Sequence, residues 1–260
     1  MSFDPESNNK LKDLLSAFDP ITLKEMDSVS LLDRLDTKYV FNPDTLLKAL
    51  GQMKDHYRLL DVNGVQLNKY ESLYFDTDNF DMYFKHYYGR ANRYKIRARN
   101  YVGSALSFFE IKFKNNKGRT IKNRVRSNQI EQMITGNSKE LLIAQTHFLE
   151  DQLKPVLWNN FTRMTFVSKN LTERLTIDLN LQFKHNEKNV EYPGLVIAEV
   201  KHDKSSSSSA FIKLMKKMHV RQGSVSKYCL GVISLYESIK QNNFKRNIQT
   251  IKNICNENNS

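Results

Sequence analysis

The sequence has little of several residues that mark other classes of protein. Of 260 residues, only two are cysteine, five are proline and nine are glycine. Cys229 and Cys255 have neither the spacing of metal ligands nor the density of a disulfide framework, which favours a reducing compartment. The longest apolar runs, such as residues 195–198, are far shorter than the roughly 18 residues that a membrane span needs.

The first residues also lack the basic segment and apolar core of a signal peptide. Hydrophobic residues make up 40% of the chain and charged residues 26%, a composition typical of a soluble globular protein. We therefore expect a soluble, cytoplasmic protein with no transmembrane segment.

The charge of the chain is strongly one-sided. The formal net charge is +12 at pH 7, which indicates an anionic partner. Nucleic acid, an acidic membrane surface and phosphorylated small molecules all meet this condition, and net charge does not separate them.

Charged residues alternate with apolar ones in several segments, which is the period of a β-strand. Six segments follow this pattern, at 34–39, 95–99, 109–114, 121–126, 174–178 and 198–203. An open sheet with an ordinary solvated face is one interpretation. However, the polar faces are mostly basic, whereas a solubilising face mixes both signs. A sheet that curls shut would turn these cations inward and line a channel that binds an anion.

Helical periodicity and capping signals lie between these segments. We expect helices before about residue 32, after Asn42-Pro43-Asp44, after a cap at Ser127, from Ser138 to about Leu149, over 211–218 and from near Val232.

The strand segments carry an ordered series of motifs. They are Arg34-Leu-Asp-Thr-Lys38-Tyr39, Leu73-Tyr-Phe-Asp-Thr77, Lys95-Ile-Arg97-Ala-Arg99, Glu110-Ile-Lys112, Lys122-Asn-Arg124, Asn160-Phe-Thr-Arg163, Glu173-Arg174-Leu-Thr-Ile-Asp178, Glu199-Val-Lys201 and Ser226-Lys227-Tyr228. In this order the series resembles the VTC domain, the polyphosphate polymerase branch of the CYTH-like triphosphate tunnel metalloenzymes. The resemblance spans roughly residues 31–235.

The resemblance implies an α+β fold: a closed antiparallel eight-stranded β-tunnel with helices packed outside and helical N- and C-terminal extensions. The tunnel domain would cover 28–240, between an N-terminal helical extension at 1–27 and a polar C-terminal tail at 241–260.

It also implies the site residues. Carried over motif by motif, the phosphate-binding residues would be Lys38, Arg97, Arg99, Lys112, Lys122, Arg124, Arg163, Arg174, Lys201, Ser226 and Lys227. Glu199 matches the metal-binding glutamate, for Mn²⁺ or Mg²⁺, and the catalytic set would be Lys38, Arg97, Arg99, Lys112 and Glu199. The chain departs from the family at Phe161, where a tyrosine is frequent.

The implied activity is metal-dependent transfer of the terminal phosphate of ATP onto a growing polyphosphate chain. Hydrolytic relatives begin with Glu-x-Glu-x-Lys, whereas this chain has Arg34-x-Asp36-x-Lys38, which favours transfer over water activation. Two alternatives stay open: an inorganic or nucleoside triphosphatase, and a non-catalytic module that binds polyphosphate or inositol polyphosphates. We expect ATP and polyphosphate as partners and no nucleic acid, since exposed stacking aromatics are not interleaved with the cations. A membrane-protein partner is left open.

Overall fold

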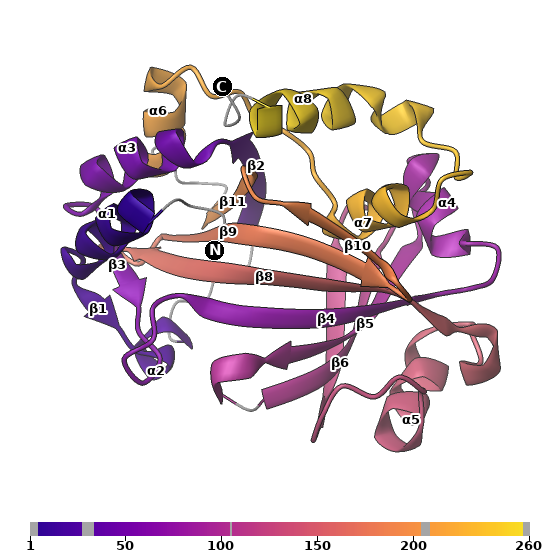
Figure 1. The fold of residues 1–260 in the computed structure, drawn as a ribbon. Coiled ribbons are helices and arrows are strands. Elements are labelled where there is room, and N and C mark those ends of the chain that lie inside the picture. Colours follow the sequence, from indigo (N-terminus) through magenta and orange to yellow (C-terminus); the bar gives the residue numbers. More distant parts are fainter. Residues whose placement is uncertain (1–4, 28–33, 105, 204–208, 257–260) are drawn as a thin grey trace.

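A computed structural model of the chain describes residues 5–27, 34–104, 106–203 and 209–256. Its centre is one large sheet that is antiparallel apart from one short parallel pair near the N-terminus (Figure 1). The main path holds eight strands, in the order β2 (Arg34–Phe41), β11 (Val196–Asp203), β9 (Glu173–His185), β8 (Lys154–Ser168), β4 (Asn68–Asp76), β5 (Arg93–Tyr101), β6 (Leu106–Lys114) and β7 (Thr120–Ser127). Three short strands lie off this path, at β1 (Pro20–Ile21), β3 (Tyr57–Leu60) and β10 (Lys188–Tyr192).

The expected α+β class and antiparallel pairing are confirmed, and closure of the sheet is not. Among the described residues, the end strands β2 and β7 do not pair with each other, so the hydrogen-bonded sheet is open. Beside β2, the segment before residue 226 contacts the strand's backbone without forming a strand of its own. Tyr39 and Gln222 form an isolated bridge, and the Gly223 amide donates to the Lys38 carbonyl at 2.9 Å.

Helices cover the sheet on its apolar side and at its ends. They are α1 (Pro5–Ser16), α2 (Leu23–Asp27), α3 (Pro43–Met53), α4 (Asp81–Tyr87), α5 (Gly136–Gln145), α6 (Ala210–Lys217), α7 (Lys227–Leu235) and α8 (Lys245–Asn256). In Figure 1, α1 and α3 lie together near one end of the long strands, and α4 and α7 lie near the other. None of the described helices has the length and apolarity that crossing a membrane requires.

Two of the expected helices need correction. The helix after Ser127 is wrong: Ser127 ends β7, where it pairs with Ser107, and residues 128–135 are irregular. Met133, which would lie on the apolar face of such a helix with Ile130 and Ile134, is 76% exposed, so this position gains nothing from a helix. The last predicted helix starts earlier than Val232, because the Ser226 hydroxyl accepts from the Cys229 amide and caps α7. In the expected polar tail, α8 forms and buries Ile251.

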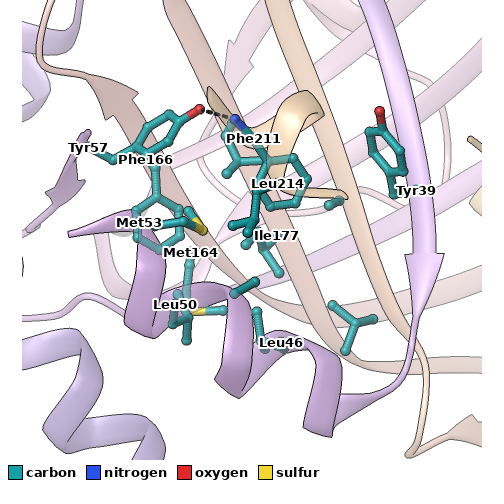
Figure 2. Packing of buried hydrophobic residues seen from close by; sticks show 14 of the residues in the cluster. Tyr39, Leu46, Leu50, Met53, Tyr57, Met164, Phe166, Ile177, Phe211 and Leu214 are labelled. Carbon is teal, nitrogen blue, oxygen red and sulfur yellow. Dashed lines mark hydrogen bonds between the residues drawn. The ribbon is translucent and has the colours of Figure 1, made fainter. Parts of the chain in front are cut away.

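The apolar faces of the strands pack as the alternation predicts. Ile177 is fully buried in a cluster with Leu46 and Leu50 of α3 and Phe211 of α6 (Figure 2). Toward the other end of the strand order, Ile96 of β5 and Ile111 of β6 pack in a second cluster with Leu142 of α5. The α3 cap is also as expected, since the Asn42 side chain accepts from the Thr45 amide. Burial of these residues fixes the strand parity and leaves the basic residues on the opposite face.

Candidate functional site

A cavity of about 210 Å³ lies on the basic face of the sheet. Seven strands of the main path contribute to it, together with the N-terminal end of α7. Eight cationic side chains line it: Lys38, Lys95, Arg97, Arg99, Lys112, Arg163, Lys201 and Lys227. Glu199 is the one carboxylate among its lining residues. A cavity so lined favours a polyanion over any neutral or cationic ligand.

A fully buried carboxylate holds one side of the cavity. Glu110 on β6 lies opposite Arg97 on β5, whose Nε and Nη2 donate to Glu110 Oε2 at 2.8 and 2.6 Å. Lys122 on β7 pairs with the other oxygen, Oε1. Burial would raise the pKa of Glu110, but Arg97, Arg99 and Lys122 hold it well below its usual range. Glu110 therefore stays ionised and fixes the Arg97 guanidinium, as expected for a cross-strand partner.

A second buried carboxylate does the same on the opposite wall. Arg163 on β8 donates through Nε and Nη2 to the two oxygens of Asp178 on β9, at 2.6 and 2.7 Å. Lys227 also contacts Asp178 Oδ2. Despite burial, Arg163 and Lys227 keep the pKa of Asp178 well below its usual range. Asp178 is thus a structural anion that orients two cations toward the cavity.

Three lining cations have no carboxylate partner within ion-pair distance among the described residues: Lys95, Arg99 and Lys112. Lys95 donates to the Ser226 hydroxyl at 2.9 Å, and Arg99 donates to the Ser72 hydroxyl at 3.0 Å. Arg97 and burial lower the pKa of Lys112 to about 5, and burial lowers that of Lys95 to about 8. Burial and Arg97 also lower the pKa of Arg99 to about 10. Basic side chains are therefore concentrated here without a paired carboxylate. An anionic ligand would supply the missing negative charge.

Glu199 differs from the two buried acids because it faces the cavity and a quarter of its side chain is exposed. It lies opposite Lys38 on β2, with Oε2 at 3.8 Å from the ammonium, and it also contacts Lys201. Asp36 on β2 lies opposite Lys201, at 3.8 Å from its ammonium. The partners of Glu199 are lysines on flexible stems, which can be displaced more readily than a bidentate arginine.

The structure brings most of the expected site residues together and leaves three outside. Lys38, Arg97, Arg99, Lys112, Arg163, Glu199, Lys201, Ser226 and Lys227 line the cavity. Lys122 does not line the cavity and forms an ion pair with Glu110. Arg124 lies exposed on β7, with its Cζ 4.5 Å from the ring centroid of Phe108. Arg174 is directed to the N-terminal segment, where it donates to the Met26 carbonyl at 2.9 Å. The backbone of Arg34 lies in β2, and its side chain is outside the described part.

Four polar lining residues were not among the expected site residues: Lys95, Tyr74, Thr176 and Tyr228. Strand parity alone indicates Lys95, since it alternates with Arg97. Tyr74 is 4% exposed, as a core residue would be, and yet it lines the cavity. Its register opposite Arg97, which only the pairing of β4 with β5 reveals, places it there.

Comparison with known proteins gives one family. The family model described as the VTC domain matches residues 33–236. No curated protein matches the chain. Among solved structures, the Hippeastrum protein HpAC1, described as having a dominant triphosphatase activity, is 12% identical with a TM-score of 0.49, covering 76% of this chain and 94% of that one. The PH1819 protein of Pyrococcus horikoshii OT3 is 13% identical with a TM-score of 0.43, covering 76% and 96%.

Proposed function

The chain belongs to the VTC domain family, and from this premise we propose that it is a polyphosphate polymerase. In this proposal the cavity holds the triphosphate of ATP, and the terminal phosphate is transferred onto a growing polyphosphate chain. The lining cations act as the phosphate-binding residues, with Lys38, Arg97, Arg99 and Lys112 nearest the reacting groups. Lys122, Arg124 and Arg174, which lie outside the cavity, would contact a chain that extends beyond it.

The observation that carries the proposal is the excess of positive charge around the cavity. Of its eight basic lining side chains, Lys112 is mostly uncharged until an anion binds, because its pKa is lowered to about 5. Glu199 is the one carboxylate that faces the others directly, while Glu110 pairs with Arg97 and Asp178 pairs with Arg163 and Lys227. A triphosphate carries about three to four negative charges at neutral pH, which would balance most of the remainder. Phosphoryl transfer requires in-line positioning and stabilisation of charge on the transferred group, and needs little covalent chemistry from the protein. Fixed guanidinium groups such as Arg163 meet that requirement.

The donor set fits a divalent cation that is bound mainly through the substrate. None of the described residues form a group of three acidic, histidine or cysteine side chains that could hold a metal. Glu199 alone would provide a protein ligand, and phosphate oxygens and water would supply the others, as is usual for Mg²⁺ in phosphoryl-transfer sites. Bound in this way, Mn²⁺ or Mg²⁺ would neutralise charge on the phosphate oxygens. Glu199 would exchange its lysine contacts for the metal.

The choice of transfer over hydrolysis rests on the acids beside Lys38. Hydrolytic relatives have two acidic residues at the start of this motif, and here the first position is Arg34. The remaining acid, Asp36, lies beside Lys201. One metal-binding carboxylate fewer disfavours activation of water and leaves a second phosphate as the better acceptor.

Incubation of the pure protein with ATP and Mn²⁺ or Mg²⁺, followed by separation of the phosphate products by length, tests the proposal. We expect ADP together with phosphate chains longer than the substrate's own. Arg99→Gln, purified in the same way, is the control for contaminating kinases and should give none. Release of inorganic phosphate alone would identify a triphosphatase. Binding of tripolyphosphate without any turnover would identify a binding module.

A further inference from the structure

Tyr74 brings a hydroxyl group into a cavity that is otherwise lined mainly by cations. It stands on β4 directly opposite Arg97, and Arg97 Nη1 donates to its hydroxyl oxygen at 3.1 Å. The other two nitrogens of that guanidinium donate to Glu110. All three Arg97 nitrogens thus donate to a protein acceptor, which fixes the guanidinium and leaves two of its five N–H groups for other contacts.

The ring of Tyr74 packs against a second tyrosine that is itself fixed by hydrogen bonds. It stacks on Tyr228 with centroids 5.2 Å apart and planes inclined by 29°. The Tyr228 hydroxyl bonds to Asp76, which also accepts the amides of Met82 and Tyr83, each at 3.0 Å. Asp76 therefore ties the stacking partner to the start of α4. A phenol held in this way is directed into the cavity without loss of rotamer entropy on binding.

The hydroxyl proton of Tyr74 has no acceptor in the described part of the chain, where its only hydrogen bond is the one that it accepts. Burial would raise the pKa of this phenol, but Arg97, Arg99 and Lys95 outweigh burial and lower it. A more acidic phenol is a stronger donor to an anionic acceptor. Phe161, which pairs with Tyr70 on the same strand as Tyr74, offers no hydroxyl that could fill this role.

We propose that Tyr74 binds the substrate directly, by donating its hydroxyl proton to a non-bridging oxygen of the bound phosphate chain. This inference rests on the proposed function, because the phosphate chain is the ligand. Arg97 then acts in part through Tyr74. Glu110 fixes the Arg97 guanidinium, and Arg97 donates to the Tyr74 oxygen, which leaves the hydroxyl proton for the ligand.

Calorimetry with tripolyphosphate, without metal and without turnover, tests the contact. Tyr74→Phe keeps the stacking on Tyr228 and removes only the hydroxyl, and we expect the Kd to rise about tenfold or more. Tyr83→Phe is the matched control, since it removes a buried phenol hydroxyl that donates instead to the Lys240 carbonyl at 2.7 Å. Its Kd should equal that of the wild type.

A second variant separates direct donation from mere positioning of Arg97. A monofluorinated tyrosine at position 74 is a stronger donor and a weaker acceptor than tyrosine. While its absorbance shows a protonated phenol, it should bind tripolyphosphate more tightly if it donates to the ligand. It should bind less tightly if its hydroxyl serves only to accept from Arg97. That second result, or an unchanged Kd for Tyr74→Phe, would overturn this inference alone. No binding by the wild type would overturn the proposed function as well.

Discussion

Lys112 should make the binding of phosphate chains depend on proton uptake. Its Cα pairs with those of Lys95 and Lys122 across three adjacent strands, and Arg97 and Arg99 stand on the same face. Glu110 is the nearby acid, but its oxygens are taken by Arg97 and Lys122. Arg97, together with burial and the other nearby cations, lowers the pKa of Lys112 to about 5, so at pH 7 the amine is mostly neutral in the free protein.

A bound polyanion reverses this situation. Its charge offsets that of the surrounding cations, and the pKa of Lys112 returns toward the ordinary lysine value. Binding at pH 7 should therefore take up about one proton at Lys112, while Lys95 and Lys227, with pKa values of about 8, each add only about 0.1. Because the complex holds the extra proton, affinity should rise by up to about tenfold per pH unit as pH falls toward 5. Below pH 5 the free site is already protonated, and this dependence should end.

The assay is calorimetry of tripolyphosphate at pH 7 in buffers that differ in ionisation enthalpy, where the slope of heat against that enthalpy counts protons. Lys112→Arg is the control, since a guanidinium keeps its charge throughout. Protons released by the ligand are the same for both proteins, so the difference between them isolates Lys112. We expect the wild type to take up about one proton more. Equal uptake by both proteins would show that Lys112 is already charged in the free site and would refute the reasoning.

Three other changes test neighbouring features. Arg99→Ala should weaken tripolyphosphate binding at least about tenfold, since a charge-assisted contact contributes roughly 1.5–3 kcal/mol; an unchanged Kd in calorimetry contradicts this. Glu199→Gln should tighten metal-free binding, because a repulsive carboxylate is gone, and should reduce metal-dependent ADP release by about a hundredfold or more; equal release by both proteins would show that Glu199 is not the metal ligand. Gly231→Ala should lower the melting temperature by several degrees, since its Cβ would stand 2.6 Å from Cδ1 of Phe183 and overpacking costs about 1–3 kcal/mol; an unchanged melting temperature would refute this packing.

The division of each strand into two faces was predictable from the sequence, because it needs only the period of a strand. Ile96 and Lys95 lie on opposite faces in any sheet that buries one of them. The helix after Asn42 was likewise predictable, since its cap and apolar stripe are local. The failed helix after Ser127 shows the limit of such signals. Its apolar positions matched the helical period, but no neighbouring element covers Met133.

The pairing of charges was not predictable, because it depends on strand register. Alternation places Glu110 on the basic face, and it does not say which cation Glu110 contacts. The register of β5 against β6 sets it opposite Arg97. Similarly, strand order makes β7 an end strand, which is why Arg124 is exposed although its parity matches that of the cavity cations.

Three acids of the basic face, Glu110, Asp178 and Glu199, divide into two kinds, and this division bears on how substitutions in the site should be interpreted. Glu110 and Asp178 are almost fully buried and each holds an arginine by close hydrogen bonds. Removing Arg97 would therefore leave a buried carboxylate short of its main partner, so that loss of binding in Arg97→Ala would mix lost contact with lost stability. Arg99 pairs with no such acid in the part of the chain that the structure describes, so its replacement leaves no buried carboxylate without its partner. The partners of Glu199 are lysines, and its side chain lines the cavity. A metal can therefore displace these lysines without breaking the arginine–carboxylate pairs of the other two acids.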